Sequence, residues 1–131
     1  MSWQAYVDTS LVGTGHVDKA AIISIAGDSA WATSAGYTIS AEEMKNISGI
    51  VSGNQAAVDK AFAEGLYVAG ERYVLTKNDE GSVYARKGRE GLVISKSKQA
   101  ILIGHHGEAG VAGNATQVVE SLKDYLVGLN Y

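Results

Sequence analysis

The side chains that most often carry out chemistry in proteins are few in this sequence. Histidine occurs at His16 and at the adjacent pair His105 and His106. Neighbouring side chains on an extended strand point to opposite faces, so the pair is not expected to converge on one metal ion. Because glycines flank the pair, the sequence predicts solvent-exposed loop histidines and no metal site.

Two carboxylate pairs could in principle serve acid–base catalysis. Glu42-Glu43 follows Ser40 with capping-box spacing, and Asp79-Glu80 lies in turn material. Carboxylates in both contexts are expected to accept local hydrogen bonds. The chain has no cysteine, and it contains no nucleophile elbow, phosphate-binding loop, metalloprotease motif or dinucleotide fingerprint. We therefore expect a binding protein that needs no cofactor, and not an enzyme.

Aromatic residues gather at the two ends of the chain and in the segment after the first turn signal. If the terminal helices lie side by side over the first hairpin, these rings could form an exposed shelf of the kind that docks polyproline II segments. The alternative is that the rings belong to the core. The residues concerned are Trp3, Tyr6, Trp31, Tyr125 and Tyr131.

Basic residues are concentrated in one part of an acidic chain whose net charge is -3. Such a concentration suits an acidic protein partner or a polyanionic headgroup, and the alternative is ordinary solvated strands and turns. Arg86, Arg89, Lys96 and Lys98 are expected to lie close together across one hairpin. Seven of the eleven basic residues fall in this region: Arg72, Lys77, Arg86, Lys87, Arg89, Lys96 and Lys98.

The first half of the chain alternates helical and strand periodicity. Apolar residues at i, i+4 and i+8 predict a helix over residues 2–12, with Ser2 as its N-cap. Residues 20–25 and 30–35 read as a hairpin. Ser40 begins a helix that fades at Gly53, and residues 54–65 are ambiguous between a short helix and a loop.

From Leu66 onward, apolar residues recur at every second position, as in a β-strand. Short runs separated by tight turns predict strands that pair antiparallel, because a parallel crossover needs a dozen or more residues. A closing helix follows a glycine-rich loop, with Asn114 or Thr116 near its cap. This order of elements predicts an α+β domain with helices on an antiparallel sheet. The predicted strands cover residues 67–69, 72–77, 83–87, 92–96 and 100–105.

Composition sets the remaining limits. The chain has 131 residues, of which 46% are hydrophobic and 19% charged, with no proline, and this predicts one globular domain over residues 1–131. The negative net charge argues against a nucleic-acid binder that relies on a global positive field. Apolar runs are too short to cross a bilayer, and the N-terminus lacks signal-peptide features, so we expect a cytosolic protein.

Several segments, in the same order from one end of the chain to the other, resemble the profilin family. The most specific is the opening Trp-Gln-x-Tyr-Val-Asp motif at residues 3–8. The others are Trp31-Ala32, residues 64–73, residues 84–88 with Gly91, and residues 118–126. The short profilins of amoebae, plants and fungi are the most similar in pattern.

The resemblance implies a central antiparallel sheet with the terminal helices on one face and smaller helices on the other. It also implies a monomer without enzymatic activity, acting in the cytoplasm at the cytoskeleton. The implied partners are monomeric actin, whose polymerisation and nucleotide exchange it would regulate, proline-rich proteins such as formins, and phosphoinositide headgroups. The runner-up is a profilin-like adaptor for proline-rich peptides or lipid headgroups with weak or no actin binding.

The resemblance also assigns residues to each surface. The proline-rich site carries over to the five aromatic residues named above. The phosphoinositide site is expected on Arg72, Arg86, Lys87, Arg89, Lys96 and Lys98. The actin face falls on Phe62, Arg72, Lys77, Arg86, Lys87, Lys96, Val111, Gly113, Thr116, Gln117 and Glu120.

Overall fold

A computed structural model describes residues 3–34, 36–79, 82–108 and 110–131, without the side chains of Asn78 and Asp79. The expected N-cap Ser2, the hairpin residue Ala35 and Glu80 of the second carboxylate pair lie outside the described residues.

The described strands form a seven-stranded sheet in the order β2-β1-β7-β6-β5-β4-β3. Every neighbouring pair is antiparallel, which confirms the pairing predicted from the short turns. The first hairpin joins the later strands because β1 pairs with β7 along its whole length. The strands are β1 (Lys19–Ser24), β2 (Ala30–Thr33), β3 (Leu66–Val68), β4 (Glu71–Asp79), β5 (Ser82–Lys87), β6 (Glu90–Lys96) and β7 (Ala100–His106).

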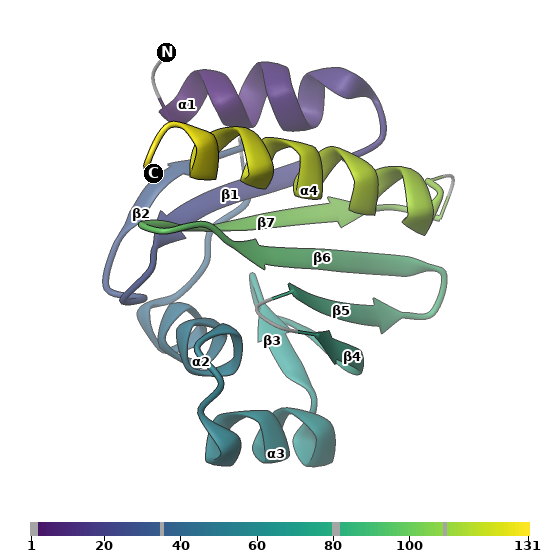
Figure 1. The fold of residues 1–131 in the computed structure, drawn as a ribbon. Helices are drawn as coiled ribbons and strands as arrows, with labels where there is room; N and C mark the ends of the chain where they lie inside the picture. Colours follow the sequence, from purple (N-terminus) through teal and green to yellow (C-terminus); the bar gives the residue numbers. More distant parts are fainter. Residues whose placement is uncertain (1–2, 35, 80–81, 109) are drawn as a thin grey trace.

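Helices cover both faces of the sheet, as Figure 1 shows. On one face lie α2 (Ala41–Val51) and α3 (Gln55–Glu64). On the other lie the N-terminal segment and α4 (Ala112–Gly128), which run side by side and bring the two ends of the chain together. The expected α+β architecture is therefore confirmed. In the described part of the chain, no helix is long and apolar enough to span a membrane.

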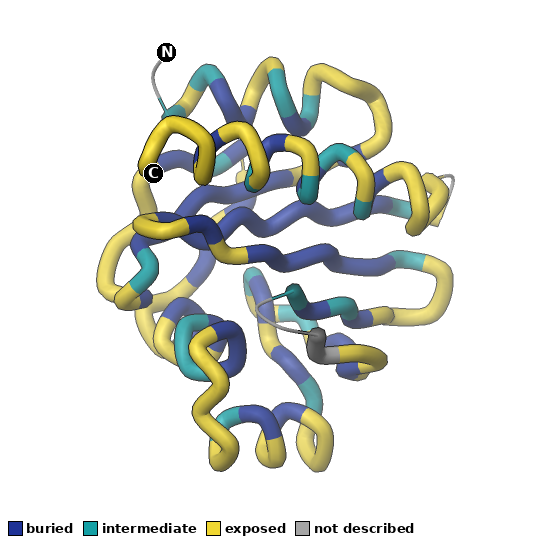
Figure 2. The backbone as a smooth tube through the Cα atoms, in the orientation of Figure 1, coloured by how far each residue is buried: buried dark blue, intermediate teal, exposed yellow. Residues whose placement is uncertain are grey.

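Each face of the sheet has its own apolar core, and β7, an interior strand of the sheet, contributes to both. Ile101 and Ile103 pack into the cluster beneath α2 and α3. Ala100 and Leu102 pack into the cluster beneath α4 and the N-terminal segment. This alternation follows from the two-residue period of a strand. In Figure 2 the strands of the sheet centre are accordingly buried along their length.

The capping box predicted at Ser40 is present. The Ser40 hydroxyl accepts a hydrogen bond from the Glu43 amide at 3.1 Å, and the Glu43 carboxylate accepts one from the Ser40 amide at 2.8 Å. The ambiguous segment is helical, because the Asn54 side chain accepts a hydrogen bond from the Ala57 amide at 3.1 Å and begins α3.

Two helix predictions need correction. The N-terminal helix is α-helical only over α1 (Trp3–Ala5), then π-helical over η1 (Tyr6–Leu11) and 3-10 over η2 (Val12–Thr14). In the wide π turn the Val12 amide bonds to the Val7 carbonyl. Neither Asn114 nor Thr116 caps α4: the cap residue is Val111, which makes no side-chain cap bond. Thr116 instead donates to the Ala112 carbonyl within the helix.

Candidate functional site

The five predicted aromatic residues meet where the two ends of the chain lie together, and we call them the aromatic cluster. Trp3 is at its centre, with ring centroids 4.9 Å from Trp31, 5.7 Å from Tyr131 and 5.8 Å from Tyr6. Tyr125 extends the cluster, 6.3 Å from Tyr6. These rings come from α1, η1, β2, α4 and the segment after α4, so the arrangement depends on the terminal helices crossing the first hairpin.

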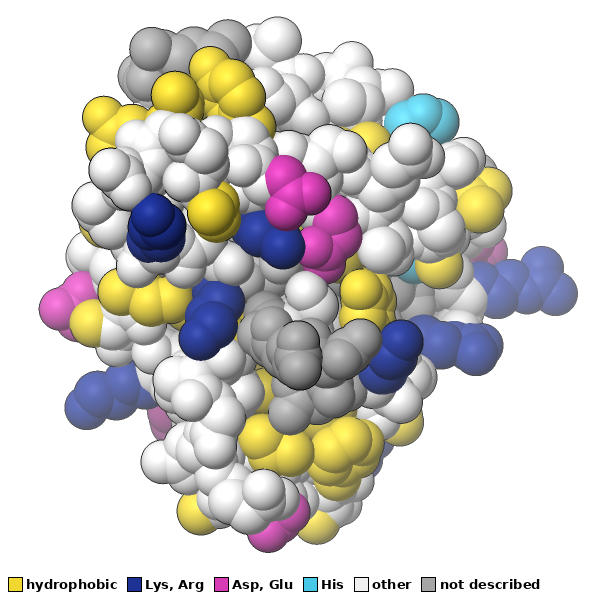
Figure 3. Space-filling model, in the orientation of Figure 1, with side chains coloured by type: hydrophobic (Ala, Val, Ile, Leu, Met, Phe, Trp, Pro, Cys, Tyr) yellow, Lys and Arg dark blue, Asp and Glu magenta, His cyan; other side chains and the backbone are white. Residues whose placement is uncertain are grey.

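Exposure decides between a shelf and a core. Tyr6 is buried, but Tyr125 is 55% exposed, Tyr131 44% and Trp31 36%. Figure 3 shows hydrophobic side chains gathered at this corner of the surface. The aromatic cluster therefore has a buried base and an exposed upper layer, and the alternative that these rings all belong to the core does not agree with their exposure.

Polar contacts hold the base of the cluster. The Gln4 side-chain amide donates to the Thr33 carbonyl at 2.9 Å and to Asp8 Oδ1 at 3.1 Å, which ties the N-terminal segment to β2. Burial raises the pKa of the Tyr6 phenol, and the neighbouring Tyr125 adds to the shift. Tyr6 therefore keeps its proton at neutral pH. Sequence analysis missed Gln4 as a positioning residue, although it stands inside the Trp-Gln-x-Tyr-Val-Asp motif.

A second surface lies on the part of the sheet that α4 leaves uncovered, on the outer face of β4 and β5. Arg86 lies opposite Val74 in the strand pairing, and Val74 is 53% exposed. Lys77 stacks over the Tyr84 ring, with Nζ 5.7 Å from its centroid. Arg72 joins this surface to the end of α3, because its Nε donates to the Glu64 carbonyl at 2.8 Å. Three of the predicted actin-face cations thus share one sheet face.

The helical residues assigned to the actin face lie at its borders. Phe62 on α3 and Val111 before α4 are exposed apolar side chains. Gly113 and Gln117 are exposed in the first turns of α4, and Thr116 is half-buried. Glu120 is engaged within the protein, because it accepts a hydrogen bond from Ser82 at 2.8 Å and pairs with Lys123 at 3.4 Å.

The remaining cations do not form the single cluster expected from the sequence. Arg89 lies in the β5–β6 turn, whereas Lys96 ends β6 and Lys98 lies beyond it. An extended strand of this length separates Arg89 from Lys96 by about 20 Å. Arg86 and Arg89 therefore lie at one end of β6, and Lys96 and Lys98 at the other. The prediction that these four lie close together is wrong.

Lys87 and Lys98, like Arg72, already have anionic or polar partners within the protein. Lys87 alternates to the opposite face from Arg86 and pairs with Glu71 at 3.3 Å, which lowers the pKa of the Glu71 carboxyl. Lys98 Nζ donates to Asn130 Oδ1 at 2.7 Å.

The prediction that the adjacent histidines lie in an exposed loop is also wrong. His105 and His106 are both buried and end strand β7 instead of lying in an exposed loop. His105 Nδ1 bonds to Asp18 Oδ1, and its Nε2 lies 3.2 Å from Glu90 Oε1 without hydrogen-bond geometry. Within the described residues, no group of three or more His, Asp or Glu side chains is arranged to hold a metal ion.

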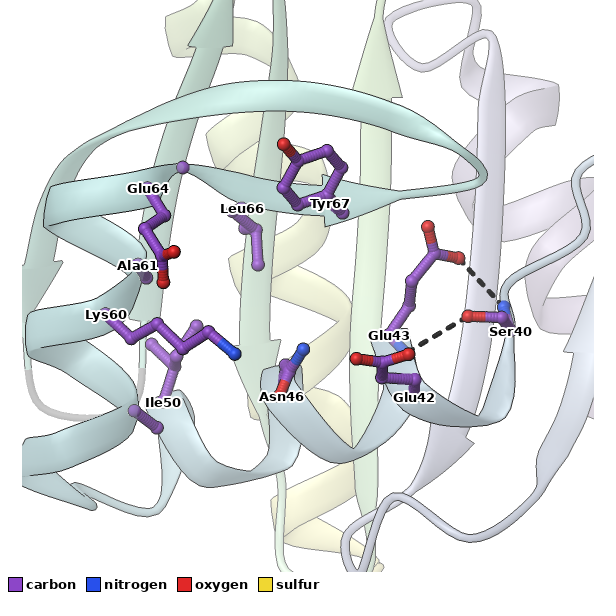
Figure 4. A pocket seen from close by; sticks show the side chains of 12 residues that line it. Ser40, Glu42, Glu43, Asn46, Ile50, Lys60, Ala61, Glu64, Leu66 and Tyr67 are labelled. Atoms are coloured by element: carbon purple, nitrogen blue, oxygen red, sulfur yellow. Dashed lines mark hydrogen bonds between the residues drawn. The ribbon is translucent and has the colours of Figure 1, made fainter.

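The structure also has a cavity of about 430 Å³ between α2, α3 and β3, far from the aromatic cluster (Figures 1 and 4). Lys60 extends across it toward Asn46, and the apolar side chains of Ile50 and Leu66 also line it. Glu43 lies at the edge of the cavity and makes the two capping-box hydrogen bonds with Ser40 that Figure 4 draws.

The family model for profilin matches residues 1–131 of the chain. The chain belongs to the profilin family. Profilin of Schizosaccharomyces pombe is 44% identical over 131 residues, with all of both chains covered, and profilin of Saccharomyces cerevisiae is 44% identical over 133 residues with the same coverage. Profilins are known as actin-binding proteins and not as enzymes.

Solved profilin structures have the same fold. The Schizosaccharomyces pombe profilin crystal structure superposes with a TM-score of 0.92 at 41% identity, covering 99% of this chain and 100% of that one. Mouse profilin IIa, solved in complex with a double repeat from the FH1 domain of mDia1, is 18% identical and superposes with a TM-score of 0.79 over 100% of both chains. At that identity the likeness shows the profilin fold alone.

Proposed function

We propose that this chain binds monomeric actin and the proline-rich segments of formin-type proteins, and so regulates actin polymerisation and nucleotide exchange on actin in the cytoplasm. Its membership of the profilin family supports the actin part. The observation that carries the proline-rich part is the aromatic cluster, whose exposed rings lie over a buried base.

The chemistry of the cluster suits a polyproline II ligand. Such a helix has three residues per turn and no internal hydrogen bonds, so its carbonyl groups need donors and its pyrrolidine rings need flat apolar contacts. Trp3 supplies an indole N–H and a ring face, and Tyr125 and Tyr131 supply exposed rings with hydroxyl donors. The FH1 complex of mouse profilin IIa supports the same class of partner.

The actin-binding surface is proposed on the outer face of β4 and β5 together with the start of α4. Arg72, Lys77 and Arg86 provide positive charge beside the exposed Val74. Acidic groups on a partner would be steered to such a surface. Phe62 and Val111 would add apolar contacts at its borders.

A second candidate is the adaptor function with weak or no actin binding. It is favoured by one observation, that two of the cations predicted on the actin face are already engaged inside the protein: Arg72 with the Glu64 carbonyl and Lys87 with Glu71. Assembly of pyrene-labelled actin separates the two functions. An actin-monomer binder suppresses spontaneous nucleation, whereas an adaptor leaves it unchanged.

Binding of phosphoinositide headgroups is part of the same proposal. The cations at the two ends of β6 would act as two separate sites, Arg86 with Arg89 and Lys96 with Lys98. Each cation near an anionic surface contributes about 1 kcal/mol at most, so neither pair alone makes a strong site.

The deciding experiment for the aromatic cluster is calorimetric titration with decaproline. Trp3→Ala is expected to weaken binding by about 2 kcal/mol, roughly thirtyfold, because it removes the central ring of the cluster. Tyr67→Ala is the matched control, since Tyr67 is an exposed aromatic residue on β3 outside the cluster. If the Trp3→Ala protein binds as tightly as the wild type, the aromatic cluster is not the binding site.

A further inference from the structure

The turn between β6 and β7 holds the segment that follows α4. The Ser97 hydroxyl donates to the Tyr131 carbonyl at 2.9 Å, and the Gln99 amide donates to the same oxygen. From the other side, the Tyr131 amide donates to the Leu126 carbonyl at 2.9 Å. The backbone of Tyr131 is therefore held both by the turn and by the end of α4.

The residue before Tyr131 is held in the same way. Lys98 Nζ donates to Asn130 Oδ1 at 2.7 Å, and the Gln99 side-chain amide donates to the Asn130 carbonyl at 3.2 Å. Asn130 has φ of 70°, in the left-handed region that residues other than glycine rarely adopt. This conformation turns the chain back from α4 toward the β6–β7 turn, and the contacts from Lys98 and Gln99 stabilise it.

The hydroxyl of Ser97 is well suited to this role because it is itself fixed. Ser97 is buried, and its oxygen accepts a hydrogen bond from the Ala100 amide at 3.2 Å. Its single proton has two acceptors within reach, the Tyr131 carbonyl at 2.9 Å and the Ala100 carbonyl at 3.3 Å, and the contact to Tyr131 is the shorter. Ala100 belongs to the core beneath α4. Ser97 thus links the backbone of Tyr131 to the apolar core of the sheet.

Tyr131 needs such support. Its ring packs edge-on against Trp3, with centroids 5.7 Å apart, yet 44% of the residue remains exposed. A ring with so much exposed surface has few packing contacts to fix it. Ordering it before the ligand arrives removes part of the entropy cost of binding.

We propose that Ser97 is a positioning residue of the aromatic cluster, which acts through the Tyr131 backbone to hold the Tyr131 ring beside Trp3. Ser97 does not itself touch the ligand. The identity of that ligand, a polyproline II segment, rests on the proposed function, whereas the ordering of Tyr131 by Ser97 does not.

A double-mutant cycle on decaproline binding tests the proposal. Ser97→Ala is expected to weaken binding about fivefold, the effect of losing one ordinary hydrogen bond. In the Tyr131→Ala background, Ser97→Ala should have no further effect, because the ring on which it acts is gone. Ser52→Ala is the matched control, since Ser52 also donates to a backbone carbonyl, that of Gly49, on the other face of the sheet. Equal losses in both backgrounds would mean that Ser97 acts only through general stability.

A measurement without ligand separates this proposal from the proposed function. In ¹⁵N-labelled protein, Ser97→Ala should lower the heteronuclear NOE at Asn130 and Tyr131 and leave α4 up to Leu126 unchanged. It should also weaken the proton NOEs between the Tyr131 and Trp3 rings. If the wild type does not bind decaproline, the proposed function fails and these NOE data alone decide the role of Ser97. Unchanged NOE values in the variant overturn it.

Discussion

Glu43 on α2 accepts a hydrogen bond from the Gly70 amide in the β3–β4 turn at 2.9 Å, across 27 residues of sequence. The same carboxylate accepts from the Ala69 amide at 3.1 Å and from the Ser40 amide at 2.8 Å. Ala69 has φ of 54° and Gly70 φ of 80°, and such successive left-handed residues point their amides toward one acceptor. One side chain therefore caps α2 and closes a turn of the sheet edge.

Glu43→Ala should lower the free energy of unfolding by about 2 to 4 kcal/mol, because it leaves the three amides without their acceptor. Urea unfolding followed by circular dichroism measures the change. Glu42→Ala is the matched control: Glu42 is exposed one residue earlier, and its loss should cost less than about 1 kcal/mol. Similar losses for both variants would show that the bonds from Ala69 and Gly70 add nothing.

Stability should fall at alkaline pH because of two buried tyrosines. Burial raises the pKa of Tyr37 and of Tyr73 far above the ordinary value of 10.0, and Glu71 adds to the shift at Tyr73. Below that pH both phenols are protonated in the folded and unfolded states. Above it the unfolded chain releases protons that the folded protein keeps, so stability decreases by about 1.4 kcal/mol per pH unit for each tyrosine.

Tyr37→Phe isolates one of these groups. The Tyr37 hydroxyl is buried without a hydrogen-bond partner among the described residues, so its removal should leave stability at neutral pH unchanged or raise it. The decline of the urea midpoint above pH 10 should become shallower. Tyr67→Phe, at an exposed site, is the matched control, and a slope for Tyr37→Phe identical to that of the wild type would contradict the assignment.

On the proposed actin surface, Arg72→Glu and Arg86→Glu are each expected to weaken the affinity for monomeric actin by about 2 kcal/mol, since each reverses a charge that would face acidic partner groups. Lys87→Glu should have a smaller effect, because Lys87 lies on the other sheet face with Glu71. Titration of labelled monomeric actin measures the affinity, and Lys45→Glu on α2 is the control. Wild-type affinity in both arginine variants would show that this surface is wrongly placed.

Binding to vesicles that contain phosphoinositides should weaken as salt rises, because screening shortens the reach of exposed charges. Since the cations at the two ends of β6 are separate, Arg86→Ala with Arg89→Ala and Lys96→Ala with Lys98→Ala should weaken binding independently, by about 1 kcal/mol per cation at most. Vesicle co-sedimentation at several ionic strengths measures this. Binding that ignores ionic strength would count against an electrostatic site.

The features that the sequence predicted correctly depend on local patterns. Ser40 and Glu43 form the expected capping box because both partners lie within one turn. The aromatic cluster could not be predicted from local patterns alone, because Trp3 and Tyr131 lie at opposite ends of the sequence and come together only in the tertiary fold. The family resemblance was needed to assign both residues to one site. The contacts that Ser97 and Gln99 make with Tyr131 could not be predicted from the sequence, because hydrogen bonds to a backbone carbonyl leave no pattern in side-chain types.

The histidines show why local reasoning can fail. The neighbouring Gly104 and Gly107 indicated an exposed loop, but two other glycines, Gly91 and Gly110, make space for the buried His106 side chain. A Cβ at Gly91 would lie 2.4 Å from the His106 ring, and one at Gly110 would lie 2.9 Å from the His106 Cβ. Gly91 is on a different strand, so this relationship depends on the pairing of β6 with β7.

Strand β7 contributes alternate side chains to both apolar cores. Neither core is therefore expected to open without disturbing the other. Opening the core beneath α4 exposes Leu102, and opening the opposite core exposes Ile101 and Ile103 on the same backbone segment. Because β7 is also paired with a strand on each side, we expect its amide hydrogens to exchange with solvent only when the sheet itself comes apart. The helices on both faces are expected to belong to one cooperative unit, with the slowest exchange at its centre in β7.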